Sequence, residues 1–174
     1  MLWLKIVGAV FIISGFGSYG LMSAGSMDKR VEQIKNIRLA MRFLEKEITY
    51  LHTPLSLAMA RAAECIPAPA SRLFEDCSRN LRDRQGITIH EAWSQSLSNL
   101  RRQSDLNNDD IIVLHSVSSQ MGMSGAEEQK RLFTMIQEHL SIQEERARRE
   151  AESGRKLRSY GGFILGATVV LLLL

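Results

Sequence analysis

Apolar residues recur every three or four positions at the start of the central part of the chain. They are Val31, Ile34, Ile37, Met41, Leu44, Ile48 and Leu51. In a helix of about 3.6 residues per turn, this spacing places them all on one face, with polar residues on the other face. The pattern therefore predicts an amphipathic helix over residues 31–51 that packs its apolar face against other elements.

Proline residues mark where the next helices begin and end. Thr53 is expected to be an N-cap and Pro54 the first position of a second helix, because proline lacks the N–H that a first turn leaves unpaired. Pro67 and Pro69 end that helix. A third helix is expected from about Ser71 to Arg82, before a glycine.

Capping signals mark the starts of three more helices. Thr88 and Glu91 form a capping box, in which the hydroxyl and the carboxylate each accept a backbone N–H. The acids and amides of residues 107–110 begin a fifth helix that ends near Gly122, and Ser124–Glu127 is a second capping box that opens the longest helix. No stretch alternates as a half-buried strand would, so the predicted fold is all-α, an antiparallel bundle of about six helices.

Both ends of the chain are apolar. Residues 6–27 carry no charge, and Ile6–Met22 is their apolar part; residues 159–174 are also uncharged and end in leucines. A helix needs about 20 apolar residues to cross a bilayer, so both stretches are expected to span a membrane, the second being short. The expected organisation is an N-terminal transmembrane segment (1–27), a cytoplasmic helical domain (28–158) and a C-terminal transmembrane segment (159–174). A cleaved signal peptide is the alternative for the first stretch.

Basic residues gather on the inner flanks of both stretches. The central side carries Lys29, Arg30, Lys35, Arg38 and Arg42 after the first stretch, and Arg146, Arg148, Arg149, Arg155, Lys156 and Arg158 before the second. Cytoplasmic loops carry the excess of Lys and Arg in membrane proteins. The central domain is therefore expected in the cytoplasm, with both termini across the membrane.

Small residues recur four positions apart in both apolar stretches. Ser14 and Ser18 lie in the first, and Gly162 and Gly166 form a GxxxG in the second. Such positions let helix backbones approach closely in lipid. They predict packing between membrane helices, although small residues are also common in spans that do not associate.

Composition and charge exclude several classes of protein. The net charge of +3 over 174 residues agrees with basic membrane flanks, and no basic stripe is interleaved with aromatic residues, so no nucleic-acid partner is expected. Cys65 and Cys77 have no CxxC spacing, so they predict reduced thiols, buried or half-buried, and no metal or disulfide framework.

The sequence contains only partial or misplaced matches to motifs for catalysis and cofactor binding. The GxGxxG of residues 15–20 lies inside a predicted span, away from any strand. His90 and Glu91 match the start of an HExxH motif, but Ser94 occupies the position of its second histidine. Residues 105–116 fail as an EF-hand loop, because its glycine and closing glutamate are missing, so their acids are expected to cap a helix. No enzyme activity and no cofactor is expected.

Several motifs together resemble the stage III sporulation protein AB family, a membrane-protein family of endospore-forming bacteria. The resemblance covers nearly the whole chain. It rests on Glu47-Ile48-Thr49-Tyr50 with Thr53-Pro54-Leu55, on Gly86 with Glu91-Ala92-Trp93, on Gly122 with Glu128-Gln129, and on the charged helix that ends in Lys156–Tyr160 before a leucine-rich terminus. No single motif is diagnostic, but the order and spacing of the motifs together make the resemblance specific.

The resemblance implies a place in a protein complex. The family's cytoplasmic part is similar to the helical-bundle domain of the inner-membrane platform proteins of type II secretion and type IV pilus machines. Its members belong to the channel complex between mother cell and forespore, in the mother-cell membrane facing the forespore. The implied partners are the sporulation ATPase (stage III sporulation protein AA-like), other membrane proteins of the channel complex, and further copies of the chain, since platform proteins usually carry two such domains.

The sequence also offers candidate positions for partner contact. They are Glu127, Glu128, Lys130 and Arg131 at the start of the last helix, and Arg101 and Arg102 in the preceding loop; a solvated face is the alternative for each. The expected function is a platform subunit that couples the ATPase to a membrane channel. The alternative is a membrane-tethered signalling or scaffold adaptor that dimerises through its last long helix as a coiled coil.

Overall fold

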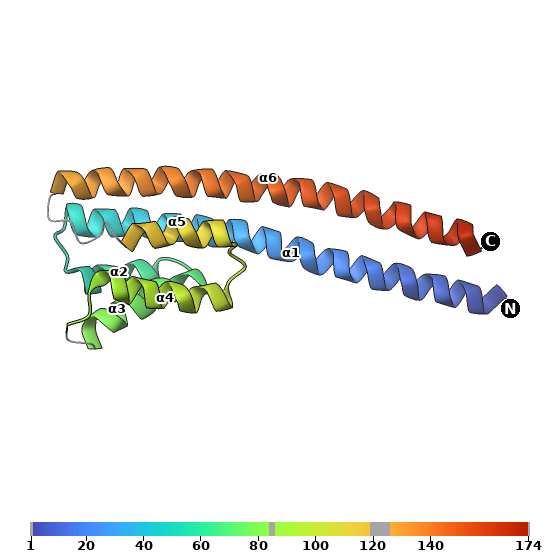
Figure 1. Cartoon of the computed structure of the whole chain (residues 1–174), viewed down its shortest axis with the longest axis horizontal. Helices are drawn as coiled ribbons and strands as arrows, with labels where there is room; N and C mark the ends of the chain where they lie inside the picture. Colours follow the sequence, from blue (N-terminus) through green and yellow to red (C-terminus); the bar gives the residue numbers. More distant parts are fainter. Residues whose placement is uncertain (1, 84–85, 119–125, 174) are drawn as a thin grey trace. The chain divides into compact units, whose positions relative to one another are not determined.

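The computed structural model describes the backbone of residues 2–83, 86–118 and 126–173, and the side chains of residues 25–83, 86–118 and 128–154. Within these residues the chain is all-α, with six helices and no strand (Figure 1). The helices are α1 (Leu2–Thr49), α2 (Leu55–Glu64), α3 (Ala70–Asp83), α4 (Ile89–Gln103), α5 (Asn108–Ser118) and α6 (Ala126–Leu173). The predicted all-α class is confirmed.

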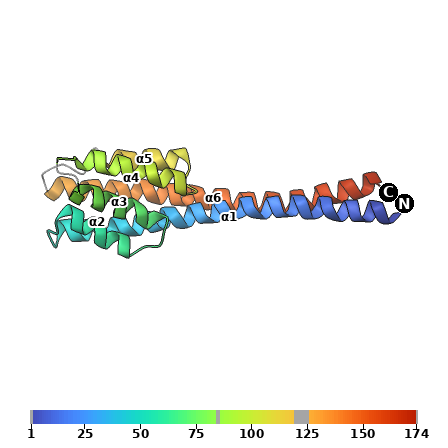
Figure 2. The same ribbon diagram turned by 90° about the horizontal axis from the view of Figure 1, so that it is seen from below.

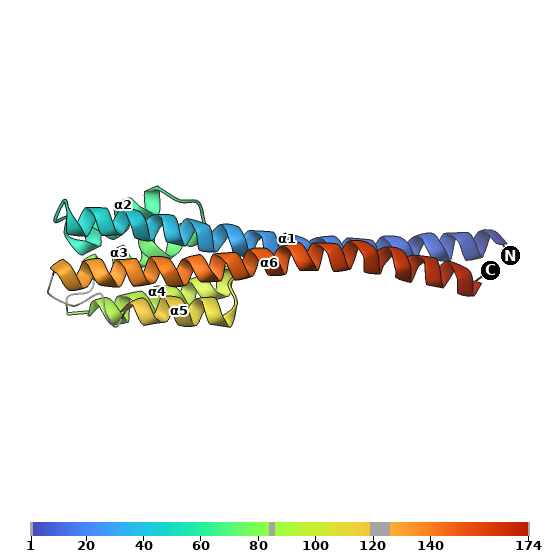
Figure 3. The same cartoon turned by 90° about the horizontal axis from the view of Figure 1, so that it is seen from above.

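The chain divides into two compact units. The bundle is Arg30–Arg146, and the terminal pair is Met1–Lys29 with Ala147–Leu174. Within the bundle, α2, α3, α4 and α5 pack in chain order (Figure 2), while α1 and α6 lie side by side and antiparallel (Figure 3). Polar bonds join these two long helices, since Arg42 Nε donates to Gln137 Oε1 over 3.2 Å and Arg38 donates to Glu144 over 2.7 Å.

The core of the bundle consists of the apolar faces that the sequence pattern predicts. From α1 it takes Ile34, Ile37, Met41 and Leu44, all essentially inaccessible to solvent. Phe74 of α3 packs edge-on against Trp93 of α4, with ring centroids 5.8 Å apart. The other helices add buried residues at three- and four-residue steps: Met59, Leu73, Leu97, Leu114, Val117, Leu132, Phe133, Ile136 and Leu140.

The local signals for helix starts are largely confirmed. Thr88 and Glu91 form the complete capping box at α4, and Gly86, just before it, has a φ of +90°, which a residue without Cβ adopts readily. At α5, Asn107 Oδ1 accepts the backbone N–H of Asp110, and Asp110 Oδ2 accepts the backbone N–H of Asn107. These acids and amides therefore cap a helix. The second predicted box, Ser124–Glu127, lies outside the described side chains.

The structure corrects three details of the sequence prediction. Pro54 occupies the N-cap position of α2 and not its first turn, because the hydroxyl of Thr53 donates to the carboxylate of Glu47 instead of capping the helix. Leu51 lies beyond the end of α1 and is 64% exposed. Cys65 is exposed, whereas Cys77 is buried as expected, and burial raises the pKa of the Cys77 thiol to about 12.

The terminal pair contains the two ends of the chain, both helical. Met27 and Gly154 approach closely there, since a Cβ on Gly154 would lie 2.9 Å from the sulfur of Met27. Over the part of the chain whose side chains are described, no helix is long and apolar enough to cross a membrane. The expected spans, residues 6–22 and 159–174, and their packing positions Ser14, Ser18, Gly162 and Gly166 lie outside those side chains.

Candidate interaction surface

The corner between α1 and α2 is organised by the buried carboxylate of Glu47. Its Oε2 accepts the hydroxyl of Thr53 over 2.7 Å and the guanidinium of Arg61 over 2.9 Å, and its carbonyl accepts the N–H of Thr53. These hydrogen bonds, first that from Thr53 and then that from Arg61, lower the pKa of Glu47 below its ordinary value although burial opposes the shift. Glu47, Thr53 and Pro54 therefore form a structural turn, which leaves Tyr50 exposed on its outer side.

The second motif, Glu91-Ala92-Trp93, is also structural. Glu91 closes the capping box, and Ala92 and Trp93 are fully buried. The indole N–H of Trp93 donates to the carbonyl of Leu114 over 2.8 Å, so α4 is tied to α5 by a buried hydrogen bond. Ala92 and Trp93 therefore stabilise the bundle and are inaccessible from its surface.

A buried polar cluster joins the start of α5 to α1. Arg30 donates twice to the carboxylate of Asp110, over 2.7 and 3.0 Å, and both side chains are less than a tenth exposed. One turn along α1, Gln33 exchanges two hydrogen bonds with Asp105 in the α4–α5 connection. The sequence indicates Arg30 only as a basic residue of the membrane flank and does not single out Gln33, because both look like ordinary polar residues of an amphipathic helix.

The outer face of α1 carries exposed cations and apolar side chains. We define the α1 face as Lys35, Leu39, Arg42, Phe43 and Lys46, which are spaced to lie along the solvent side of the helix, together with Tyr50 directly after its last residue. Leu39 is 51% exposed and Tyr50 67%. Lys35 and Lys46 have no ion pair within the described part of the chain. The face therefore presents cations with apolar groups between them.

Two hollows follow this face where α1 meets α6. One, of about 540 Å³, is lined by Leu39, Arg42, Phe43, Glu45, Lys46, Tyr50 and Gln137. The other, of about 180 Å³, is lined by Lys35, Asn36, Arg38, Leu39, Arg42 and Glu144. The two hollows share Leu39 and Arg42, so they lie next to each other along the helix. They are open and shallow, which suits a protein surface better than a small molecule.

The predicted contact positions fall into two separate groups. Arg101 and Arg102 lie in the last turn of α4 and not in a loop, and they donate to Asn108 over 3.2 Å and to Asn99 over 2.5 Å. Glu128, Lys130 and Arg131 are exposed in the first turns of α6, and Gln129 is half-buried. Glu127 has no described side chain, and Gly122 lies outside the described residues.

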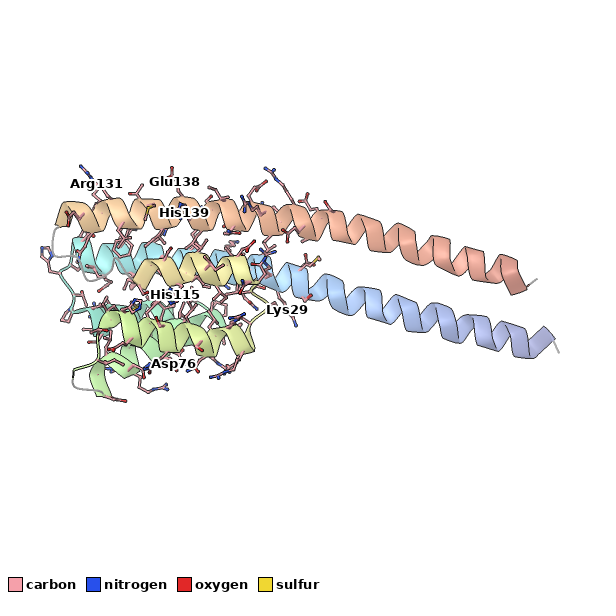
Figure 4. All side chains as sticks on the ribbon, viewed as in Figure 1. Lys29, Asp76, His115, Arg131, Glu138 and His139 are labelled. Atoms are coloured by element: carbon pink, nitrogen blue, oxygen red, sulfur yellow. The ribbon has the colours of Figure 1, made fainter. Side chains whose placement is uncertain are left out.

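The two groups lie at opposite ends of the bundle. The end of α4 is joined to the start of α5 by the bond from Arg101 to Asn108, whereas α6 begins beyond the far end of α5 (Figure 1). Arg131 projects outward at that far end, as Figure 4 shows. The structure therefore does not combine the two groups into one surface.

Titratable residues do not assemble into a reaction centre in the described part of the chain. No group of three or more His, Cys, Asp or Glu side chains there has the geometry to hold a metal ion. His90 and His115 meet edge to face with centroids 5.7 Å apart, and the hydroxyl of Ser118 lies 2.9 Å from Nδ1 of His90. Both imidazoles are exposed at the surface, outside the two hollows.

Comparison with known proteins assigns the chain to a family. The sequence model of the family described as stage III sporulation protein AB matches residues 5–174. The chain belongs to this family. The stage III sporulation protein AB of Bacillus subtilis (strain 168) is 31% identical over 171 residues, which make up 98% of this chain and 99% of that protein.

A solved structure of a stage III sporulation protein AB has the same fold. It superposes with a TM-score of 0.66 at 30% identity, and the match covers 71% of this chain and 96% of that chain. The resemblance that the sequence motifs indicate is thus confirmed. The structure gives Glu47, Thr53, Pro54, Ala92 and Trp93 roles in the fold, whereas Leu39 and Tyr50 of the α1 face are exposed to solvent.

Proposed function

We propose that this family member is a non-enzymatic platform subunit of the sporulation channel complex between mother cell and forespore. In this proposal its terminal stretches, residues 6–22 and 159–174, span the mother-cell membrane facing the forespore, and the bundle lies in the cytoplasm. The partner is the sporulation ATPase (stage III sporulation protein AA-like), whose conformational changes the bundle relays to other membrane proteins of the channel. The flanking Lys and Arg support this orientation.

One observation carries the proposal. The two helices that supply the uncharged ends of the chain, α1 and α6, also supply much of the core of the bundle, through Ile34, Ile37, Met41, Ile136 and Leu140. Polar bonds from Arg38 and Arg42 join these two helices inside the bundle. Because packed helices are stiff, a displacement imposed on the bundle would move both helices together.

The tethered-adaptor alternative has less support. A coiled-coil dimer through the last helix needs a free apolar stripe on that helix. Leu132, Phe133, Ile136 and Leu140 are instead buried inside the bundle of the same chain. Among the large apolar side chains described for α6, Ile142 is the exposed one.

Binding of the ATPase to the full-length chain tests the proposal. The chain is reconstituted in lipid nanodiscs and titrated with the purified ATPase by biolayer interferometry, with empty nanodiscs as the blank. We expect saturable binding that is lost when Glu128 and Arg131, or Arg101 and Arg102, are reversed in charge. Reversal of Arg72 and Arg79, exposed on α3, is the matched control and is expected to leave binding unchanged. A folded chain that ignores the ATPase at micromolar concentration would refute the coupling role.

A further inference from the structure

The outer face of α6 complements the α1 face in charge and spacing. Glu138 and Ile142, four positions apart on α6, are both exposed. Arg131 is also exposed, and it lies seven positions, or about two turns, before Glu138 on the same side of the helix. Figure 4 shows Arg131 and Glu138 pointing away from the bundle. The α1 face offers Leu39 and Arg42 at a similar spacing, so an apolar group and an acid on α6 correspond to an apolar group and a cation on α1.

The corresponding residues lie at the same height along the bundle. Arg42 bonds to Gln137, the neighbour of Glu138, and Arg38 bonds to Ser141 and Glu144, which bracket Ile142. Because α1 and α6 are antiparallel, Leu39 is therefore level with Ile142, and Arg42 with Glu138. About two turns further, Tyr50, just past the end of α1, is level with about Arg131 of α6.

We propose that two copies of this chain pair through these faces, about a two-fold axis parallel to the helices of the bundle. Such an axis places α1 of each copy opposite α6 of the other. It leaves the position of every residue along the axis unchanged. It therefore brings Arg42 of each copy against Glu138 of the other, and Leu39 against Ile142, with Tyr50 beside Arg131. The contact is isologous, so every pair forms twice and the assembly closes as a dimer.

Charge selects a second copy over other occupants of the face. Arg42 uses its Nε for Gln137, so its terminal nitrogens remain for a carboxylate, and Glu138 has no ion pair within the described part of the chain. Glu145 already has a polar interaction in its own chain, and the pairing does not depend on it. An anionic lipid surface would match the cations of α1 but would be repelled by the acid of α6.

The orientation of the axis also agrees with the proposed function. The inference rests on that function only in assuming that both copies are anchored in one membrane. Arg30 of α1 and Arg146 of α6 lie at the same end of the bundle, because the two helices are antiparallel. An axis parallel to the helices keeps these ends together in both copies, as two chains anchored in one membrane require. The face spans only about four helical turns, so we expect a weak contact that relies on the shared membrane.

Cross-linking between two differently tagged full-length chains tests the pairing. Both carry Cys65→Ser, which removes the exposed thiol, while Cys77 is buried. One chain carries Leu39→Cys and the other Ile142→Cys, and the two are co-reconstituted in nanodiscs and treated with a short bis-maleimide. We expect a heterodimer on the gel several-fold stronger than that from Leu57→Cys mixed with Ile112→Cys, two other exposed apolar positions.

Charge reversal identifies the ion pair. Arg42→Glu or Glu138→Arg, placed in both cysteine chains, is expected to reduce the cross-link several-fold, and the two changes together are expected to restore it. Circular dichroism melting of each variant confirms that the bundle is folded. Because the assay contains no ATPase, its result is independent of the ATPase titration.

Three results would overturn the pairing. One is a cross-link no stronger than that of the Leu57 and Ile112 mixture in folded protein. Another is a cross-link that the combined Arg42→Glu and Glu138→Arg variant fails to restore after either change has reduced it. The third is a cross-link that disappears when phosphatidylglycerol replaces phosphatidylcholine in the nanodisc, which would identify the face as a lipid contact.

Discussion

At the scale of single residues, Trp93 connects three helices. Its ring is fully buried and packs edge-on against Phe74 of α3, and its indole N–H donates to the carbonyl of Leu114 in α5. A buried tryptophan requires such an acceptor, since an unpaired N–H in a core is costly. The same side chain therefore supplies both apolar packing and the orientation of α5 against α4.

Replacing Trp93 with phenylalanine tests this role. Trp93→Phe keeps an aromatic ring but removes the hydrogen bond to the Leu114 carbonyl and leaves the site underfilled. We expect the free energy of unfolding to fall by about 2 kcal/mol or more. Urea denaturation followed by circular dichroism measures it. Tyr50→Phe, on an exposed aromatic residue, is the control and should change stability by less than about 0.5 kcal/mol. Equal effects of the two changes would exclude a special role for Trp93.

At the scale of helices, the corner between α1 and α2 depends on one carboxylate. Glu47 belongs to the last turn of α1, Thr53 precedes α2, and Arg61 lies inside α2. Both partners donate to the same oxygen of Glu47. His52, between them, has a φ of 50°, a left-handed conformation that a non-glycine residue adopts at some cost. The hydrogen bonds to Glu47 hold the chain in this conformation.

The lowered pKa of Glu47 predicts a dependence of stability on pH. Because the folded state holds the carboxylate ionised more strongly than the unfolded state does, this stabilisation is complete above the ordinary pKa of 4.5 and is lost as the pH falls through the lower folded value. We expect Glu47→Gln to be less stable than the parent chain at pH 7, and the difference to shrink below pH 4.5. Denaturant titrations between pH 7 and pH 3 measure it.

A neighbouring glutamate supplies the control for this experiment. Glu45 lies two positions earlier on α1 and makes no hydrogen bond or ion pair within the described residues. Glu45→Gln should therefore leave the pH profile of the parent chain unchanged. A difference between parent and Glu47→Gln that stays constant from pH 7 to pH 3 would contradict the role of the Glu47 carboxylate.

At the scale of the whole molecule, α5 is attached to α1 by a buried ion pair. Arg30 and Asp110 are 80 positions apart in sequence and lie within 2.7 Å in the bundle. Breaking such a pair leaves one charge buried without a partner, which typically costs about 3–5 kcal/mol. The pair therefore makes the arrangement of α5 specific, since a shifted α5 would leave both charges unpaired.

A neutral substitution at Asp110 tests this attachment. Asp110→Asn keeps the size of the side chain and removes its charge, so we expect a loss of about 3 kcal/mol or more in the free energy of unfolding. Asp109→Asn, on the exposed neighbour in the same turn, is the matched control, with an expected change under about 0.5 kcal/mol. Similar losses for both variants would show that the first turn of α5 needs acids in general, not the pair with Arg30.

Local signals predicted the helices, and they predicted little of the candidate surface. The Thr88 and Glu91 box, the cap at residues 107–110 and the apolar steps of α1 depend on residues within one or two turns of each other. The role of Thr53 was mispredicted because its hydroxyl bonds to Glu47, which is decided by the fold of the corner. The sequence predicts a loop at Arg101 and Arg102, which lie in the last turn of α4, since helix ends are poorly marked when no glycine or proline follows directly.

The sequence by itself determined the all-α class, the approximate helices, their buried faces and the family, because these follow from periodicity, caps and ordered motifs that neighbouring residues encode. Only the tertiary structure decided which polar residues meet across the bundle, such as Arg30 with Asp110 and Arg42 with Gln137. It also decided that Leu39 and Ile142 face outward at the same height. The physical reason is that these contacts join residues about 80 to 100 positions apart, and such pairs exist only once the helices have packed.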